Sequence, residues 1–153
     1  MMAPIQLSRE KAAKDPGVRW DAMNEFCAFA DLKDLTPVQR VACLACDYSS
    51  TVTMADHHEY FSRMPHPDHD EVTAALRAIG ATEQAAILSA ARSAVAAASR
   101  RAPEEYENRY LAGVEFADLI EFDESFERCA TSIPACLMDY LDKHESEFIE
   151  WKP

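Results

Sequence analysis

The sequence predicts an all-α protein, a compact single-domain bundle of six to eight helices. The 153 residues include only three glycines, alanine is abundant, and no segment alternates β-branched and polar residues as a half-buried strand does. The length and the hydrophobic content of 48% fit one globular domain with a substantial core. We expect this domain to span residues 15–150, and residues 1–14 to be loosely held.

The first helix is expected over residues 18–30. The second helix has the clearest start signal in the chain. Thr36 is an N-cap residue, Pro37 takes the first helical position, and Gln39 completes a Thr-x-x-Gln capping box. β-branched and polar residues at 49–53 weaken helical propensity, so we expect this helix to kink or break there.

Six further helices are expected over residues 56–64, 69–79, 83–101, 103–119, 123–129 and 134–149. Asp68 and Thr82 stand where two of these helices start, and Gly80 fits the C′ position between them. Pro103 is placed at the N-terminus of its helix, where a missing N–H costs nothing.

Negative charge is concentrated in the last third of the chain. Residues 103–153 contain fourteen acidic and four basic residues and carry a net charge of −10, whereas residues 1–102 carry only −2. Such an asymmetry creates a negative field that repels nucleic acid and attracts basic partners. We therefore expect a basic protein as the partner, with no direct binding to nucleic acid or to a membrane.

Carboxylates three or four residues apart are neighbours on a helix surface, and rows at this spacing can imitate the phosphates of a DNA strand. The candidate partner-binding residues are Glu115, Asp118, Glu121, Asp123, Glu124, Glu127, Asp139, Asp142 and Glu145. The alternative interpretation is a solvated face that serves solubility alone.

Three observations favour a cytoplasmic location. No apolar run approaches the roughly 18–20 residues of a membrane-spanning helix, and the first ten residues do not resemble a secretory signal. The five cysteines are odd in number, which indicates free thiols in a reducing compartment. Cys43-x-x-Cys46 lies inside an apolar helix, which favours buried thiols over a redox motif, and a zinc site shared with Cys129 and Cys136 is the alternative.

A histidine-rich segment offers a second function of a different class. His57, His58, His66 and His69 lie among carboxylates, and imidazole with carboxylate is a common ligand set for zinc or iron. Adjacent histidines on a helix point about 100° apart, however, and no His-x-x-x-His pair is present. This spacing favours a polar helix end and predicts no metal and no cofactor. A small enzyme or metal-binding protein that uses these four histidines is the alternative function.

Catalytic signatures are scarce in this chain. It contains no Gly-x-Ser-x-Gly elbow, and its three glycines are too few for a glycine-rich phosphate loop. We therefore assign no catalytic residue, and a non-catalytic protein is favoured over an enzyme.

Residues 35–40, Tyr48, residues 59–61 and residues 75–81 resemble, in this order, segments of a bacterial all-helical family of unknown function. That family includes a DNA-mimic protein that binds a transcription factor. The likeness covers roughly residues 20–150 and includes an acidic stretch like residues 118–127.

The family typically carries an Asn-Gly-Gly-Phe-x-Gln-Tyr-Phe motif. Tyr60 and Phe61 match its end and Glu59 stands near its Gln, whereas residues 55–57, Ala-Asp-His, replace its Gly-Gly-Phe. The resemblance implies a helical fold, a homodimer as an oligomeric state to test, and no known catalysis.

Charge and resemblance lead to one functional hypothesis. The chain is expected to be a non-catalytic, acidic interaction protein, a DNA mimic that occupies the basic surface of a DNA-binding transcription factor. A toxin–antitoxin or immunity-type partner that uses the same face against a basic effector is a third alternative.

Overall fold

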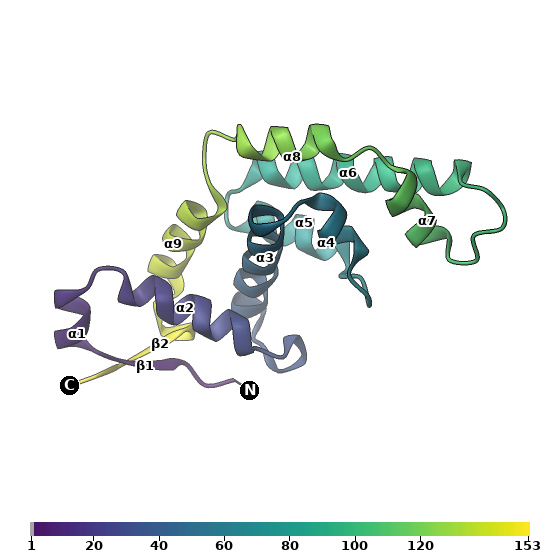
Figure 1. Ribbon diagram of the computed structural model, residues 1–153. Coiled ribbons are helices and arrows are strands. Elements are labelled where there is room, and N and C mark those ends of the chain that lie inside the picture. The colour runs from purple at the N-terminus through teal and green to yellow at the C-terminus, as the bar shows by residue number, and fades with distance from the viewer. Residues whose placement is uncertain (1) are drawn as a thin grey trace.

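Nine α-helices, two 3-10 helices and one pair of strands make up residues 2–153, the part of the chain that the computed structural model describes. The all-α prediction is confirmed (Figure 1). In chain order the elements are β1 (Ile5–Ser8), α1 (Arg9–Lys14), α2 (Val18–Phe29), η1 (Leu32–Asp34), α3 (Pro37–Met54), α4 (His57–Ser62), α5 (His69–Ala78), α6 (Thr82–Arg101), α7 (Arg109–Phe116), α8 (Ile120–Glu127), α9 (Ile133–His144), η2 (Glu145–Glu147) and β2 (Ile149–Lys152).

Helix α3 lies at the centre of the molecule and contacts α2, α4, α5 and α9. Its side chains are therefore buried on more than one face, and Tyr48 is fully buried at its middle. Tyr60 of α4 packs edge-on against Tyr48 with ring centroids 4.9 Å apart. Burial of large side chains of this kind stabilises the fold by roughly 1.5–3 kcal/mol each.

Three of the expected local start and stop signals are present, whereas Thr82 is the first residue of α6 and does not cap it. The Thr36 hydroxyl accepts the Gln39 N–H at 3.2 Å, and the Gln39 side chain accepts the Thr36 N–H at 3.0 Å, so the predicted capping box is confirmed. Asp68 caps α5, and Gly80 follows that helix with φ of +87°, a left-handed conformation that glycine adopts without strain.

The predicted break at residues 49–53 is wrong, because α3 runs unbroken to Met54, and the alternative of a kink there stays a prediction. The Thr51 hydroxyl donates to the Asp47 carbonyl at 2.9 Å, which satisfies the polar group within the helix. Ser49, Thr51 and Val52 are also buried against neighbouring elements, and this packing outweighs their weak helical propensity.

The helix predicted from Pro103 starts six residues later, at Arg109. The Arg109 guanidinium donates to the carbonyls of Pro103 at 2.8 Å and Ala102 at 3.0 Å, and to that of Ser99. These bonds satisfy carbonyls at the end of α6, and the Asn108 side chain caps α7. Residues 103–108 therefore form the connection between two packed helices.

The last helix ends at His144 and not at residue 149, and a strand that the sequence did not predict follows it. β2 pairs in parallel with β1, with Ile5 opposite Ile149 and Ser8 opposite Lys152. Phe148, just before β2, packs edge-on against Phe26 of α2 with ring centroids 5.4 Å apart. The looser packing expected of residues 1–14 in solution stays a prediction.

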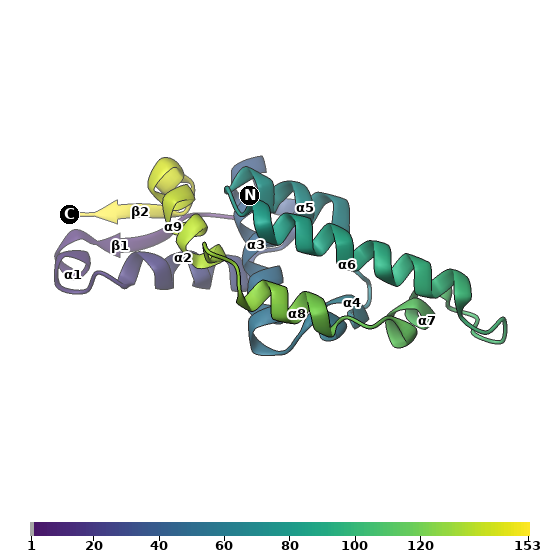
Figure 2. The ribbon, with the colours of Figure 1, turned by 90° about the horizontal axis from the view of Figure 1, so that it is seen from above.

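The elements are arranged along a line, with α1 and the sheet at one end and α7 at the other (Figure 2). α8 lies beside α6 on the side of the molecule far from the sheet. In the part of the chain that the structure describes, no helix combines the length and the apolar character that a bilayer crossing requires.

Candidate functional site

The nine predicted partner-binding carboxylates fall into two groups. Glu115, Asp118, Glu121, Asp123, Glu124 and Glu127 lie on α7, α8 and the turn between them, and Asp139, Asp142 and Glu145 lie on α9 and η2. α8 contacts α6 and α4, whereas α9 packs against α3 nearer the sheet (Figure 1). The connection from residue 128 to residue 132 separates the groups, so they do not form one continuous row.

Five residues of the first group are exposed, and we call Glu115, Asp118, Glu121, Glu124 and Glu127 the α8 acidic surface. Glu124 pairs with Arg128 at 3.2 Å, one turn along the helix and largely in water, where such a pair is weak. It is the one ion pair that this surface makes within residues 2–153. The other four carboxylates of the α8 acidic surface therefore face solvent without an ion pair in the described residues.

Asp123 differs from its neighbours because its carboxylate is turned inward. One oxygen accepts two hydrogen bonds from His57, from the backbone N–H at 2.9 Å and from ring Nδ1 at 2.6 Å. With the proton on Nδ1, ring Nε2 accepts from the Tyr48 hydroxyl at 2.7 Å. This Tyr48–His57–Asp123 chain ties α8 to α3 and α4, so Asp123 positions the acidic surface from within.

Burial explains the charge state of this chain of hydrogen bonds. The His57 side chain is fully buried among aromatic rings, with Phe126 edge-on at 6.0 Å between centroids. Burial lowers the pKa of His57, and the Asp123 carboxylate opposes that shift. Burial also raises the pKa of the Tyr48 hydroxyl. A neutral imidazole between a phenol and a carboxylate has both ring nitrogens satisfied.

The second group of carboxylates is partly neutralised. Arg19 of α2 contacts Asp142 at 2.7 Å and Glu145 at 2.6 Å. The hydrogen bond to Asp142 and the charge of Glu145 raise the pKa of Arg19. Only Asp139 of this group is exposed without an ion pair in the described residues, so the group offers less free charge than α8 does.

Two exposed apolar side chains adjoin the α8 acidic surface. Phe116, at the end of α7, is 50% exposed, and Ile120, at the start of α8, is 67% exposed. The Tyr106 ring packs edge-on against Phe116 at 5.3 Å between centroids. Apolar residues surrounded by charge are typical of protein–protein contact sites, where they supply buried area and the rim supplies specificity.

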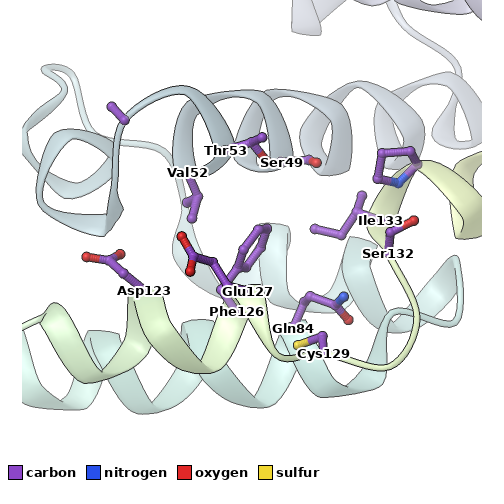
Figure 3. A pocket seen from close by; sticks show the side chains of 12 residues that line it. Ser49, Val52, Thr53, Gln84, Asp123, Phe126, Glu127, Cys129, Ser132 and Ile133 are labelled. Atoms are coloured by element: carbon purple, nitrogen blue, oxygen red, sulfur yellow. The ribbon is translucent and has the colours of Figure 1, made fainter.

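A cavity of about 390 Å³ opens between α8, the second half of α3 and the start of α9. Figure 3 shows Phe126 and Glu127 of α8 directed towards Val52 of α3, with Gln84 and Cys129 on the side of the cavity away from α3. Asp123 also lines this cavity. Its wall is mainly apolar with carboxylates at one side, so it suits an inserted apolar side chain beside a cation.

The four histidines of the alternative function do not converge. His57 is hydrogen-bonded to Tyr48 and Asp123 in the core, whereas His58 is exposed. The His66 ring stacks on Tyr110 at 4.3 Å, and His69 Nε2 shares a hydrogen bond of 2.9 Å with the Tyr110 hydroxyl. Within residues 2–153, no three histidine, cysteine or acidic side chains are placed to hold a metal ion.

The thiols are arranged differently from the predicted alternatives. Cys27 of α2 lies beside the Cys43-x-x-Cys46 segment of α3, with 3.2 Å between the sulfurs of Cys27 and Cys43. Cys129 instead lines the cavity beside α8, and Cys136 is buried on α9. The signal that could have found this cluster is the placement of Cys27 on the buried side of the first helix, facing the second.

Comparison with known proteins found one match. The model of a protein family described as DMP19-like protein matches residues 33–144, from η1 to the end of α9. The matched part contains the whole α8 acidic surface. No curated protein and no solved structure matches the chain.

Proposed function

The chain belongs to the DMP19-like family, and from this premise we propose that it is a non-catalytic DNA mimic that occupies the basic surface of a DNA-binding protein. The observation that carries the proposal is the net charge of −10 on residues 103–153, which include the five exposed carboxylates of the α8 acidic surface. DMP19 denotes a family of DNA-mimic proteins, so the family and the charge point to the same class of partner.

The spacing of the α8 carboxylates supports mimicry over general acidity. Glu121, Glu124 and Glu127 recur every three residues on an exposed helix. Helix neighbours three or four residues apart lie about 5–6 Å from one another. A DNA strand carries its charges about 3.4 Å apart along the axis, and more along its winding backbone, so the two arrays are of similar scale.

The internal bond of Asp123 supports the same role in another way. A carboxylate row competes with DNA only if its geometry is held fixed, because a mobile row loses conformational entropy when it binds. The bonds from Asp123 to His57, together with Phe126 packed on the same ring, anchor α8 to the core. The exposed carboxylates of α8 therefore stand on a helix that is anchored to the core.

A charged surface gives a fast association, whereas apolar contacts give a slow dissociation. Phe116 and Ile120 adjoin the carboxylates and supply exposed apolar area for such contacts. We place them in the interface with the α8 acidic surface. The partner is thus a protein with a basic groove flanked by an apolar patch, which distinguishes a specific mimic from a solubility feature.

The enzyme or metal-binding alternative has no comparable support. His57 has both ring nitrogens engaged in the core, and His66 and His69 stack on Tyr110. The homodimer implied by the resemblance stays a proposal, and sedimentation equilibrium of the purified chain measures it.

The experiment begins with a pull-down from native lysate and mass spectrometry, which identifies the partner. Added protein is then tested for displacement of the partner's labelled DNA site. The triple variant Glu121→Gln, Glu124→Gln, Glu127→Gln is expected to weaken displacement at least tenfold, and binding is expected to weaken steeply with salt.

The matched control is Asp21→Asn, Glu25→Gln, Asp34→Asn, which removes the same charge from exposed positions near the other end of the molecule. This control is expected to change displacement less than threefold, as a remote change in net charge does. Equal weakening by both triples, or binding that does not depend on salt, would leave α8 as a solubility feature and refute the proposal.

A further inference from the structure

Three cysteines from two helices meet where α2 packs against α3. Cys27 comes from α2, and Cys43 and Cys46 come from α3, three residues apart and therefore on neighbouring positions of one helix face. The sulfurs of Cys27 and Cys43 are 3.2 Å apart, and all three thiols are free. A sulfur–sulfur bond is about 2.05 Å long, so a shift of little more than 1 Å separates this contact from a disulfide.

The three thiols also line one cavity. Its volume is about 500 Å³, it opens to solvent, and Trp20, Asn24 and Asp47 line it with them. The Cys46 thiol donates a hydrogen bond to the Asn24 amide oxygen at 3.4 Å. A small oxidant can therefore reach thiols that lie within reach of one another, which is the arrangement of a redox-sensitive pair with its resolving thiol.

We propose that Cys27, Cys43 and Cys46 form an oxidation site, at which a hydroperoxide oxidises the Cys46 thiolate and Cys27 then closes a disulfide that links α2 to α3. This chemistry is separate from the acidic surface. It requires a hydroperoxide as the oxidant and no metal or cofactor.

The steps balance in atoms and electrons. The Cys46 thiolate attacks the terminal oxygen of the hydroperoxide, the O–O bond breaks, and Cys46 becomes a sulfenic acid. The alkoxide or hydroxide that leaves takes up the proton that the Cys46 thiol lost on ionisation, and departs as alcohol or water. The Cys27 sulfur then attacks the Cys46 sulfur, and the hydroxyl leaves as water with the Cys27 proton. Cys43, in contact with Cys27, can take over the bond by thiol–disulfide exchange and return Cys46 to a thiol. In sum two thiols lose two electrons and two protons to the hydroperoxide.

Electrostatics favour Cys46 as the attacking group. A hydrogen bond from Cys27 lowers the pKa of the Cys46 thiol, and burial with the negative charge of Asp47 opposes that shift. Asp47 is itself paired with Arg63, at 2.7 and 2.9 Å from its two oxygens, which reduces its repulsion of a thiolate. Hydrogen bonds to Cys43 and Cys46 raise the pKa of Cys27, so Cys46 is the thiol of this pair that ionises more readily.

The test treats the full-length reduced protein with hydrogen peroxide and then titrates thiols after denaturation. Free thiols are expected to fall from five to three per chain, and dithiothreitol should restore them. Trypsin cleaves after Arg19, Lys33, Arg40 and Arg63, so the non-reduced digest should contain peptide 20–33 cross-linked to peptide 41–63. Cys129 and Cys136 share peptide 129–143, which should remain unlinked.

Three variants assign the roles, each checked for folding by circular dichroism. Cys27→Ser should abolish the cross-link, Cys46→Ser should slow its formation roughly tenfold or more, and Cys136→Ser should have no effect. Absence of the cross-link in the oxidised wild type, or a cross-link that involves peptide 129–143 instead, would overturn the proposal. If Cys27→Ser does not fold, the non-reduced digest of the oxidised wild type still shows whether peptide 20–33 is cross-linked to peptide 41–63. A Cys46→Ser variant that oxidises at the wild-type rate would refute the role of Cys46 as the attacking thiol.

Discussion

Asp123→Ala is the substitution that best separates a structural carboxylate from a partner-binding one. Asp123 and Glu121 are two residues apart on α8, yet Asp123 bonds to His57 and Glu121 is exposed. Removal of the Asp123 carboxylate leaves the backbone N–H and the ring Nδ1–H of His57 without their acceptor. The Asp123→Ala variant is therefore expected to unfold more easily, whereas Glu121→Ala is not.

The expected loss of stability follows from the two N–H donors of His57 that lose their acceptor. A buried donor left without an acceptor costs about 1–3 kcal/mol. Because the cavity beside α8 admits water that can satisfy one of them, we expect Asp123→Ala to lower the free energy of unfolding by about 1–3 kcal/mol. Asp123→Asn retains an acceptor oxygen and should lose only about 1 kcal/mol. Glu121→Ala should change stability by no more than about 0.5 kcal/mol.

Urea denaturation at pH 7, followed by far-ultraviolet circular dichroism, measures these differences, and the denaturant slope checks that each variant still unfolds in two states. The reasoning is refuted if Asp123→Ala is no less stable than Glu121→Ala. A loss for Asp123→Asn as large as that for Asp123→Ala would show that charge, and not hydrogen-bond acceptance, holds the helix.

Three further predictions concern packing, pH and metals. A Cβ on Gly113 of α7 would lie 2.5 Å from the carbonyl oxygen of Val95 in α6. Gly113→Ala should therefore lower the free energy of unfolding, measured in urea, by about 1–3 kcal/mol. Unchanged stability would contradict the close contact of α7 with α6. Burial lowers the pKa of His69 from 6.5 to about 4, so the unfolded chain binds more protons between these values and stability falls as the pH drops through them. Between pH 7 and pH 5 the free energy of unfolding should therefore fall by about 2 kcal/mol. The fall should be smaller in His69→Gln, and equal falls in both proteins would exclude His69 as the cause. Elemental analysis of untagged protein should find no stoichiometric zinc or iron, since the histidines are divided between two separate contacts.

Local chemistry made much of the fold predictable. Thr36 and Gln39, Asp68, and Gly80 mark helix ends through bonds or backbone angles that involve residues close in sequence. Such signals can be read without knowledge of the tertiary structure. The helices that they delimit, α3 and α5, start where the sequence predicts.

The errors arise where distant residues decide the outcome. Arg109 supplies the cap that ends α6, and burial of Thr51 against other helices lets α3 continue to Met54. Neither effect leaves a periodic pattern in the sequence. The strands were missed because four-residue segments give too little alternation to detect.

The candidate site was predictable in composition but not in geometry. The count of acidic residues located the charge in the last third of the chain, and the spacing placed it on helices. The inward turn of Asp123 depends on a histidine 66 residues away, and the pairing of Asp142 depends on Arg19, 123 residues away. Long-range partners of this kind decide which carboxylates remain free.

The pairing of β1 with β2 has a consequence for the order of events in folding. Ile5 and Ile149 can meet only after a chain segment of more than 140 residues has been brought together, and closing so long a loop is entropically costly in an unfolded chain. Helices that contact near neighbours, such as α6 and α7, carry no such cost and should form early. The Trp151 indole lies in β2 and bonds to Glu145 at 2.5 Å, so in a Trp20→Phe background its fluorescence should change last, after the helical signal is complete.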